Sequence, residues 1–243
     1  MFSDLPRHAA PSLIVIGNFD GVHRGHQALL ARAADQAKTL GLNLVAVTFE
    51  PHPRAFFHPD AAPPRLTGHN LKKFFLYQQG ADAVVTLPFT EKLAKASADD
   101  FMTYLAESLQ ARHLVVGPDF SFGRDRTGDV KQLQSRFGFD HVSLCDWLTD
   151  HKGPVSSTRV RGALAVGELN EAVHLLNRAY IIETTDYCLL PDGIYPVWVQ
   201  IEGKWQQKQI EITQNAVRSS FETAFLAFTG GEAPAFNLSL DEK

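Results

Sequence analysis

The sequence predicts an α/β protein with a doubly wound parallel sheet and a small C-terminal antiparallel β unit. Over about the first 180 residues, short apolar runs alternate with stretches of helical periodicity, which is typical of βαβ units. After about Tyr180, segments that alternate polar and apolar residues between turn residues predict antiparallel strands instead. We therefore expect one domain over residues 1–182 and a second over residues 183–243.

The first strand–helix–strand unit is the clearest part of the pattern. Residues 13–16 form a short apolar run that ends at Gly17, as a buried parallel strand does. Helical spacing follows from about residue 25 to residue 40, and Gly41 is the kind of residue that most often ends a helix. Residues 44–49 are a second apolar run and are expected to form the neighbouring strand.

The remaining elements of the sheet domain follow the same alternation. They are a helix at 70–79, a strand at 83–87, a helix at 98–111, and strands at 113–116 and 141–144. Ligands of open parallel sheets bind beyond the carboxyl ends of the strands. The loops after Ile16, Phe49 and Val116 are therefore the places where we expect a binding site.

Composition narrows the function classes. The chain has 243 residues, a net charge of −4 and a pI near 6.2, values that give no electrostatic footprint for nucleic acid. Cys145 and Cys188 match no metal or redox spacing and are expected to be small buried apolar residues. The sequence starts without a signal-peptide pattern and has no apolar stretch of roughly 20 residues. We expect a cytoplasmic protein that binds neither nucleic acid nor membranes.

The strongest chemical signal is the run Gly-Asn-Phe-Asp-Gly-Val-His-Arg-Gly-His at residues 17–26, between the first strand and the first helix. Backbone amides and the helix dipole favour a phosphate there, and Gly17 and Gly21 allow a tight turn. His23 and His26 are three residues apart, so at the start of a helix they would face the same side. Both could donate hydrogen bonds to an oxyanion in a transition state. The alternative is a helix cap with two solvated histidines.

A second signal is Val-Ser-Ser-Thr-Arg-Val-Arg at residues 155–161, ahead of a helix expected to run to about Val166. Ser156 or Ser157 could be a plain helix N-cap. Three hydroxyls, free helix amides and two arginines in one turn also describe a clamp for a polyphosphate. The two interpretations are equal for this segment alone, and its pairing with residues 17–26 favours the clamp.

Two further loops are weaker signals. Residues 117–129 combine flanking glycines with Asp119, two phenylalanines and two arginines, and they could hold a nucleoside. The alternative is a surface loop in which Phe120 and Phe122 anchor the core. Residues 49–57 combine stiffening prolines with aromatic side chains that could cover a planar ring, although a lone histidine such as that at position 52 is usually structural. Neither loop identifies a ligand by itself.

At these four stretches the sequence resembles the bacterial bifunctional riboflavin kinase/FMN adenylyltransferases, the FAD synthetases. Residues 17–26, 49–53 (Phe-Glu-Pro-His-Pro), 117–123 (Gly-x-Asp-Phe-x-Phe-Gly) and 156–161 (Ser-Ser-Thr-x-Val-Arg) match the adenylyltransferase half in order, within about residues 12–180. The His-x-Gly-His and Ser-Thr-x-x-Arg elements mark only the wider nucleotidyltransferase superfamily, so the FMN assignment depends on the other two loops. The resemblance implies a Rossmann-like sheet of the nucleotidyltransferase type.

The resemblance also implies a reaction, in which AMP passes from ATP to FMN and pyrophosphate leaves. Mg²⁺ would accompany ATP, without a metal site in the protein. The residues assigned to catalysis are His23, His26 and Arg161. The residues assigned to ATP binding are Gly17, Phe19, Asp20, Gly25, His26, Gly117, Asp119, Ser156, Ser157, Thr158 and Arg161. The residues assigned to FMN binding are Asn18, Phe49, Pro51, His52, Pro53, Phe56, Phe120, Phe122, Arg124 and Arg126.

The C-terminal part departs from the family pattern. The family's kinase half opens with a glycine-rich stretch that leads to Pro-Thr-Ala-Asn, and residues 180–192 contain nothing of that kind. Residues 193–197 resemble a remnant of one strand of that half, and the tail is far shorter than a full kinase domain. We therefore expect a degenerate barrel without riboflavin kinase activity.

Three alternatives stay open at this point. The same chemistry could serve another phosphorylated acceptor, as in pantetheine-phosphate or nicotinate-mononucleotide adenylyltransferases or in cytidylyltransferases. The chain could instead be a non-catalytic flavin- or nucleotide-binding module, although His23, His26 and Arg161 argue against decay of the site. Trp198 and Trp205 could form a surface for a protein partner, but packing within the barrel is the expected explanation.

Overall fold

The structure is a computed structural model and describes residues 2, 4–183, 188–218, 225–229, 232, 234 and 238. The chain forms two compact units. Unit 1 comprises residues 1–19, 25–63 and 75–148, and unit 2 comprises residues 20–24, 64–74 and 149–243. The boundaries of these units differ from the predicted domain boundary between residues 182 and 183. That boundary stays a prediction.

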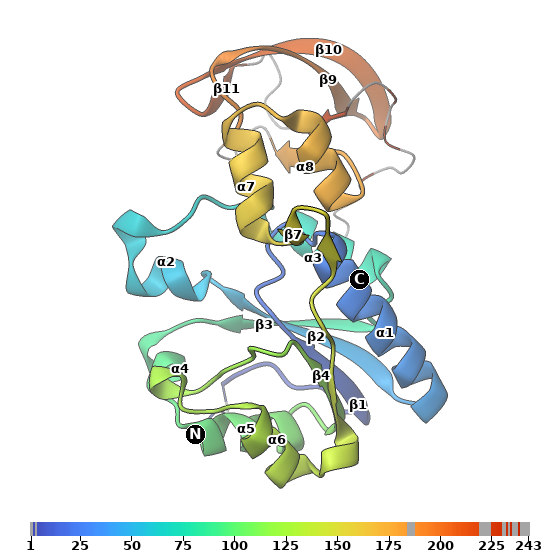
Figure 1. The fold of residues 1–243 in the computed structure, drawn as a ribbon, viewed down its shortest axis with the longest axis vertical. Helices are drawn as coiled ribbons and strands as arrows, with labels where there is room; N and C mark the ends of the chain where they lie inside the picture. Colours follow the sequence, from blue (N-terminus) through green and yellow to red (C-terminus); the bar gives the residue numbers. More distant parts are fainter. Residues whose placement is uncertain are drawn as a thin grey trace. The chain divides into compact units, whose positions relative to one another are not determined.

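Unit 1 is built on a five-stranded parallel sheet (Figure 1). Its strands are β1 (Ser12–Ile16), β2 (Asn43–Glu50), β3 (Ala83–Pro88), β4 (Ala111–Val116) and β5 (Val142–Leu144). Their spatial order is β3-β2-β1-β4-β5, so the chain builds outward from β1 on one side and then returns to fill the other. This order makes the sheet doubly wound and confirms the predicted α/β fold.

Helices cover both faces of this sheet, which explains why its central strands are apolar on both sides. The helices of unit 1 are α1 (Arg24–Leu40, whose first residue belongs to unit 2), α2 (Pro53–Phe57), α4 (Glu91–Ala94), α5 (Ala98–Glu107), α6 (Val130–Phe137) and the 3-10 helices η1 (Pro59–Ala61), η2 (Arg124–Arg126) and η3 (Phe139–His141). Residues of α5 and α6 share one core cluster with Ile14 and Val45. On the opposite side of the sheet in Figure 1, α1 buries Leu30, Ala33 and Ala37. Among the described residues, no helix is long and apolar enough to cross a membrane.

The helix predicted at residues 98–111 is shorter than expected. It begins as α5 behind a capping box in which Ser97 and Asp100 bind each other's backbone N–H groups. It ends at Glu107, because the chain turns through Gln110 with a φ of +52° before it enters β4. The prediction was wrong here because the apolar spacing of the helix continues into the first residues of the next strand.

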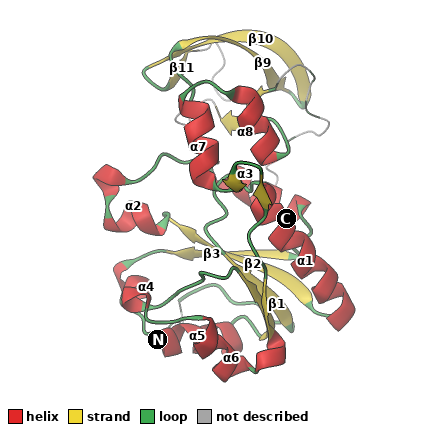
Figure 2. Ribbon diagram, viewed as in Figure 1, coloured by secondary structure: helices red, strands yellow, loops and turns green. Residues whose placement is uncertain are grey.

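Unit 2 combines two helices with an antiparallel sheet of order β11-β10-β9-β12-β8. Its elements are β6 (Thr149–Asp150), β7 (Gly153–Pro154), α7 (Ser157–Ala165), α8 (Leu169–Leu176), β8 (Tyr180–Glu183), β9 (Gly193–Ile201), β10 (Lys204–Thr213), β11 (Ala216–Arg218), β12 (Phe225–Phe228) and the first part of α3 (His69–Gln78). The long hairpin of β9 and β10 (Figure 2) turns through Glu202 and Gly203. Their φ values of +49° and +76° are those of a type I′ turn. The predicted antiparallel β unit is therefore confirmed.

The predictions for individual cysteines and tryptophans have different outcomes. Cys188 is buried, as predicted. Cys145 is partly exposed, and its predicted burial was wrong because it follows the edge strand β5, whose last residue, Leu144, is itself exposed. Trp198 and Trp205 are partly buried on β9 and β10, and the expectation that they only pack within the barrel stays a prediction.

Candidate active site

The loop between β1 and α1 adopts an unusual backbone conformation. Phe19, Gly21 and Val22 have φ values of +50°, +82° and +38°. At Gly21 a Cβ atom would lie 2.8 Å from Cδ1 of Leu66, so a larger residue does not fit without a shift. A positive φ at the β-branched Val22 costs about 1–3 kcal/mol and persists only where the surrounding structure holds it. Contacts from distant parts of the chain therefore preorganise this loop.

Both ends of the 17–26 motif belong to unit 1. The predicted site residues in this part are Gly17, Asn18, Phe19, Gly25 and His26. Phe19 is fully buried, and its ring meets the His26 ring edge to face at a centroid distance of 5.2 Å. A Cβ atom on Gly17 would lie only 3.1 Å from the Phe19 ring. Asn18 is exposed, and its carbonyl accepts a hydrogen bond of 3.1 Å from Thr48 Oγ1. The buried ring of Phe19 thus lies beside Gly17 and His26. Its predicted contact with ATP stays a prediction.

The middle of the motif belongs to unit 2, where Asp20 connects it to α7. The Asp20 carboxylate is 6% exposed and accepts hydrogen bonds from the Leu66 N–H at 3.0 and 3.3 Å and from Arg161 Nη2. Arg161 Nε also donates to the Pro64 carbonyl at 2.8 Å. Ser157 Oγ donates to the Asp20 carbonyl at 2.8 Å. The structure therefore brings together the two segments that carry the strongest signals in the sequence.

His23 is almost completely buried in unit 2, directly before the first residue of α1. Burial, together with repulsion from the nearby guanidinium groups of Arg178 and Arg161, lowers the pKa of His23 to about 4. At neutral pH the ring is therefore uncharged and carries one N–H donor. The helix begins at Arg24, close to the predicted start at about residue 25, and His23 directly precedes it. The expectation that His23 and His26 face the same side stays a prediction.

The three hydroxyl residues at the start of α7 differ in what their side chains contact. Ser156 is the N-cap of the helix, with its Oγ 3.3 Å from the Arg159 N–H that donates to it. Ser157 binds the loop through Asp20, and Thr158 is exposed in the first turn. The plain-cap interpretation thus describes Ser156, whereas Ser157 belongs to the junction between the two motifs.

The two arginines of α7 have different surroundings. Arg159 forms a bidentate ion pair with Asp150 at 2.9 and 3.0 Å and a second ion pair with Glu171 at 3.0 Å. It also donates to the carbonyls of Gly153 and Pro154. These contacts fasten the β6–β7 hairpin and α8 to α7. Arg159 is one of the two arginines of the predicted polyphosphate clamp. In the structure its guanidinium group binds carboxylates and carbonyls of the protein itself.

Residues 49–57 follow β2 in unit 1. The predicted FMN-binding residues here are Phe49, Pro51, His52, Pro53 and Phe56. His52 Nδ1 accepts a hydrogen bond of 3.0 Å from the Arg54 N–H, which makes His52 the N-cap of α2, and Pro53 is the first residue of that helix. The structural role that is usual for a lone histidine thus applies to His52, and the prolines shape the approach to α2.

An aromatic cluster gathers around Phe89, which directly follows β3. The Phe89 ring meets the rings of Phe49, Phe56 and Phe57 edge to face, at centroid distances of 5.8, 5.4 and 5.7 Å. Phe57 is 56% exposed, so the cluster has an open side. The sequence predicted roles for Phe49 and Phe56 individually and included Phe57 only within the stretch 49–57. Phe89 was missed.

Residues 117–126 follow β4 in the same unit, and here the two phenylalanines differ. Phe120 and Phe122 are stacked at a centroid distance of 5.5 Å. Phe122 is buried against Phe101 and pairs through its backbone with Gly128, where a Cβ atom would lie 2.6 Å from the Phe122 ring. Phe120 is only partly buried. The structure thus places Phe122 in the core, as the alternative interpretation of this loop expected, and leaves Phe120 closer to the surface.

The carboxyl edge of the parallel sheet gathers these loops. β1 pairs in parallel with β2 and with β4, and β2 pairs in parallel with β3, so the segments after these strands all leave the same edge. Gly117 is partly buried at this edge, while Asp119, Arg124 and Arg126 are exposed. Unit 1 therefore collects exposed polar groups and partly exposed aromatic rings at the predicted edge.

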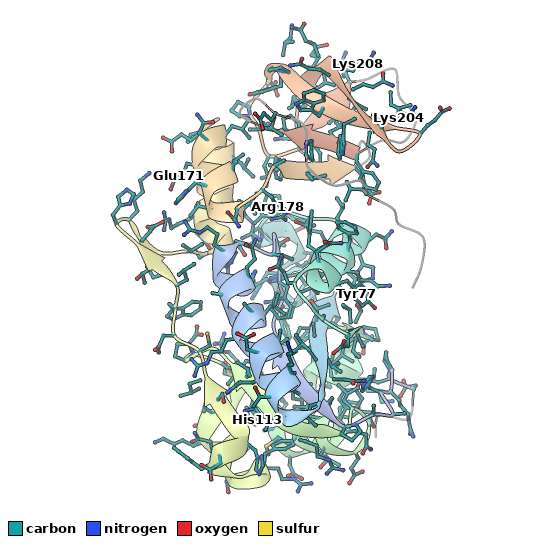
Figure 3. The ribbon with its side chains drawn as sticks, turned by 90° about the vertical axis from the view of Figure 1, so that its right-hand side faces the viewer. Tyr77, His113, Glu171, Arg178, Lys204 and Lys208 are labelled. Carbon is teal, nitrogen blue, oxygen red and sulfur yellow. The ribbon has the colours of Figure 1, made fainter. Side chains whose placement is uncertain are left out.

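One residue beside the His23 loop was not predicted from the sequence. Arg178, labelled in Figure 3, follows α8 and donates from Nη2 to the Gly21 carbonyl at 2.7 Å and from Nη1 to the Leu176 carbonyl at 3.2 Å. No local motif surrounds Arg178, and its partner at position 21 is 157 residues away in the sequence. Only the fold reveals this contact.

Comparison with known proteins identifies relatives for most of the chain. A family model described as FAD synthetase matches residues 5–159. The "Bifunctional riboflavin kinase/FMN adenylyltransferase" of Pseudomonas fluorescens is 42% identical over 181 residues, which are 73% of this chain and 57% of that protein. The protein of the same name from Escherichia coli K12 is 37% identical over 174 residues, 70% of this chain and 55% of its own length. The chain thus spans little more than half the length of these two relatives.

Two further comparisons cover more of the matched protein. A "Putative bifunctional riboflavin kinase/FMN adenylyltransferase" of Geobacillus thermodenitrificans is 36% identical over 165 residues, 68% of this chain and 89% of that protein. A solved structure described as a macrolide-efflux protein from Streptococcus pneumoniae superposes with a TM-score of 0.76 over 90% of this chain and 92% of its own, at 24% identity. That second likeness concerns the fold alone.

Proposed function

This chain belongs to the FAD synthetase family, and on that premise we propose that it transfers AMP from ATP to FMN, giving FAD and pyrophosphate. The observation that carries the proposal is the junction at Asp20, where the loop after β1 meets Ser157 and Arg161 of α7. A buried loop with nearby cations and the start of a helix suits a polyphosphate.

The proposed reaction needs no nucleophile from the protein. A phosphate oxygen of FMN attacks the α-phosphorus of ATP in line, a new P–O bond forms, and the bond to the β-phosphate oxygen breaks to release pyrophosphate. The acceptor is already an anion, so positioning and charge stabilisation supply the rate. In this proposal His23 and His26 donate hydrogen bonds to the α-phosphate and the bridging oxygen, and the neutral state of His23 leaves its ring with an N–H for that purpose.

The leaving group would be held by α7. Thr158 is exposed in the first turn, where backbone N–H groups have no partner within the helix. Arg161 would add its charge while its position is set by Asp20 and by the Pro64 carbonyl. Ser156 and Ser157 would contribute through the shape of the turn that they cap and fasten.

The nucleoside and the flavin would be held by residues of unit 1. Gly117 and Asp119, at the end of β4, are proposed to contact adenosine. The partly exposed rings of Phe49, Phe56 and Phe120 offer apolar surfaces for the flavin ring system. The further members of the proposed FMN set are Asn18, Pro51, His52, Pro53, Phe122, Arg124 and Arg126, of which His52 and Phe122 would act through the loops that they support.

Mg²⁺ is proposed to enter with ATP. Among the described residues, no group of three histidine, cysteine or acidic side chains could hold a metal ion, and the Asp20 carboxylate is already bound to Leu66 and Arg161. The triphosphate oxygens and water are the ligands that Mg²⁺ prefers. When bound, the ion would neutralise charge on the leaving pyrophosphate.

We further propose that the chain lacks riboflavin kinase activity, since residues 180–192 contain no counterpart of the glycine-rich stretch and Pro-Thr-Ala-Asn. The test incubates purified protein with MgATP and either FMN or riboflavin and separates the flavins by chromatography. FAD from FMN, and no product from riboflavin, is expected. FMN or FAD formed from riboflavin would overturn the missing kinase activity.

Two other outcomes would replace the proposed acceptor or activity. Pyrophosphate release with another phosphorylated acceptor, such as phosphopantetheine or nicotinate mononucleotide, but not with FMN, would change the substrate. Binding of ATP and FMN without pyrophosphate release would identify a non-catalytic binding module.

A further inference from the structure

We propose that Arg178 is a positioning residue, whose guanidinium group holds the Gly21 carbonyl and thereby fixes the strained turn that presents His23. This inference deepens the proposed function and rests on it for its kinetic consequence only. The arrangement lies entirely within unit 2, which contains residues 20–24, 64–74 and the segment after α8.

The contact is a direct one between side chain and backbone. Arg178 Nη2 lies 2.7 Å from the Gly21 carbonyl oxygen, and Nη1 lies 3.2 Å from the carbonyl oxygen of Leu176 in the last turn of α8. The Arg178 Nε atom is buried. A planar guanidinium with donors at fixed angles can hold both carbonyls at once, whereas an ammonium group cannot reproduce that geometry. The residue therefore connects the end of α8 to the turn.

The turn that Arg178 holds is strained and tightly enclosed. Gly21 lies between Leu66 and Leu176, since a Cβ atom on it would lie 2.8 Å from Leu66 Cδ1 and 3.5 Å from Leu176 Cδ2. Val22 follows with a φ of +38°. Its peptide bond to Gly21 includes the very carbonyl that Arg178 binds. Loss of this hydrogen bond would free the peptide to rotate, and the strain at Val22 would favour rotation. His23 is the next residue, so its ring would move.

The positive charge of Arg178 also affects the His23 ring. Burial, then Arg178, then Arg161 lower the pKa of His23 to about 4. The Asp20 carboxylate is paired with Arg161, and Arg24 is hydrogen-bonded to His174 at 2.8 Å. Burial lowers the pKa of Arg178 to about 9, so its guanidinium stays charged at neutral pH. Removing that charge, and opening the turn to water, both raise the pKa of His23 toward its ordinary value.

The experiment compares Arg178→Gln and Arg178→Lys with the unaltered protein, and uses Arg32→Gln, an exposed arginine of α1, as the matched control. The pKa of His23 is measured by NMR titration of its ring protons, assigned from the signal that His23→Gln removes. The kcat and KM of FAD formation are measured across pH. Arg178→Gln is expected to raise the pKa of His23 by about one unit or more and to lower kcat about 10²-fold, with a smaller change in the KM for ATP. Arg32→Gln should change neither quantity.

The Arg178→Lys variant separates the effect of the positive charge from the effect of the hydrogen-bond geometry. It also replaces Arg178→Gln in the test if that variant does not fold. Arg178→Lys keeps the positive charge, so the pKa of His23 should stay low, while kcat should fall about tenfold because one of the two directed hydrogen bonds is lost. An unchanged kcat and an unchanged pKa of His23 in the folded variants would overturn the inference. If the unaltered protein forms no FAD, the proposed function fails, but the titration of His23 still decides whether Arg178 controls it.

Discussion

The loop around His23 and the aromatic loops at the sheet edge are built on opposite principles. The first is buried, and charge pairs and hydrogen bonds from residues more than 130 positions away hold its backbone in strained conformations. The second contains phenylalanine rings that meet edge to face, with Phe49 and Phe89 packed against the core and Phe57 largely exposed. Substitutions in the first should therefore damage both stability and activity, whereas substitutions in the second should change ligand affinity with little effect on the fold.

The largest effect is expected from Asp20→Ala. The substitution leaves the charge of Arg161 and the N–H of Leu66 without their partner in a buried site, which costs about 3–5 kcal/mol. Urea unfolding monitored by circular dichroism measures the loss. Lys92→Ala is the control, because its ion pair with Asp4 is exposed, with 47% and 61% of the two side chains accessible, and an exposed pair contributes little to the unfolding free energy. Equal losses in the two variants would remove the distinction between the regions.

His26→Ala separates activity from stability. We expect kcat for FAD formation to fall about 10²–10³-fold, the usual effect of removing one preorganised donor to a transition-state oxyanion. The unfolding free energy should fall by only about 1 kcal/mol, for the lost edge-to-face contact with Phe19. Stopped assays with chromatography of the flavins give the first quantity, and urea unfolding gives the second. Near-normal FAD formation would contradict the proposed role.

The pH dependence of stability should report on the buried loop. His23 has a pKa of about 4 in the folded protein and an ordinary value of 6.5. Between these values the unfolded chain binds more protons, so stability decreases as the pH falls. From pH 7 to pH 5 this group should remove about 2 kcal/mol. His23→Gln should lose that part of the dependence, and a slope as steep as that of the unaltered protein would show that other groups cause it.

The smallest effect is expected at the aromatic cluster. Phe56→Leu keeps an apolar side chain but removes the ring that meets Phe57 and Phe89. The KM for FMN should rise about three- to tenfold, which corresponds to the 0.5–1.5 kcal/mol of a typical aromatic contact, while kcat stays within about twofold. Steady-state assays with varied FMN test this expectation. A large loss of kcat would show that this loop, too, orders the reacting groups.

The sequence predicted those parts of the molecule that depend on neighbours in the chain. The strand before Gly17, the helix up to Leu40 and the cap at Ser156 all follow from apolar spacing or from one polar residue at a helix start. The antiparallel character of residues 193–213 also follows from local alternation. The shorter helix α8 was missed, because its eight residues lie close to α7 and offer few repeats of the apolar pattern.

The contacts that arrange the candidate site could not be predicted in the same way. The Arg178–Gly21 hydrogen bond joins positions 157 residues apart, and the Arg161–Asp20 pair joins positions 141 apart. Nothing in the spacing of Ser-Thr-Arg-Val-Arg indicates that Arg159 turns toward Asp150 while Arg161 turns toward Asp20. Phe89 lay outside every motif, so only the parallel pairing of β2 and β3 brings it beside Phe49.

The discontinuous makeup of unit 2 has a consequence for synthesis on the ribosome. Asp20 leaves the ribosome early, but Ser157, which binds its carbonyl, is 137 residues later. At about 5–20 residues per second, about 7 to 27 seconds pass before Ser157 has been synthesised. During this time β1 and β2 of unit 1 can already pair. Residues 20–24 still lack their contacts with α7. The nascent chain would therefore acquire the parallel sheet of unit 1 before residues 20–24 reach their final conformation.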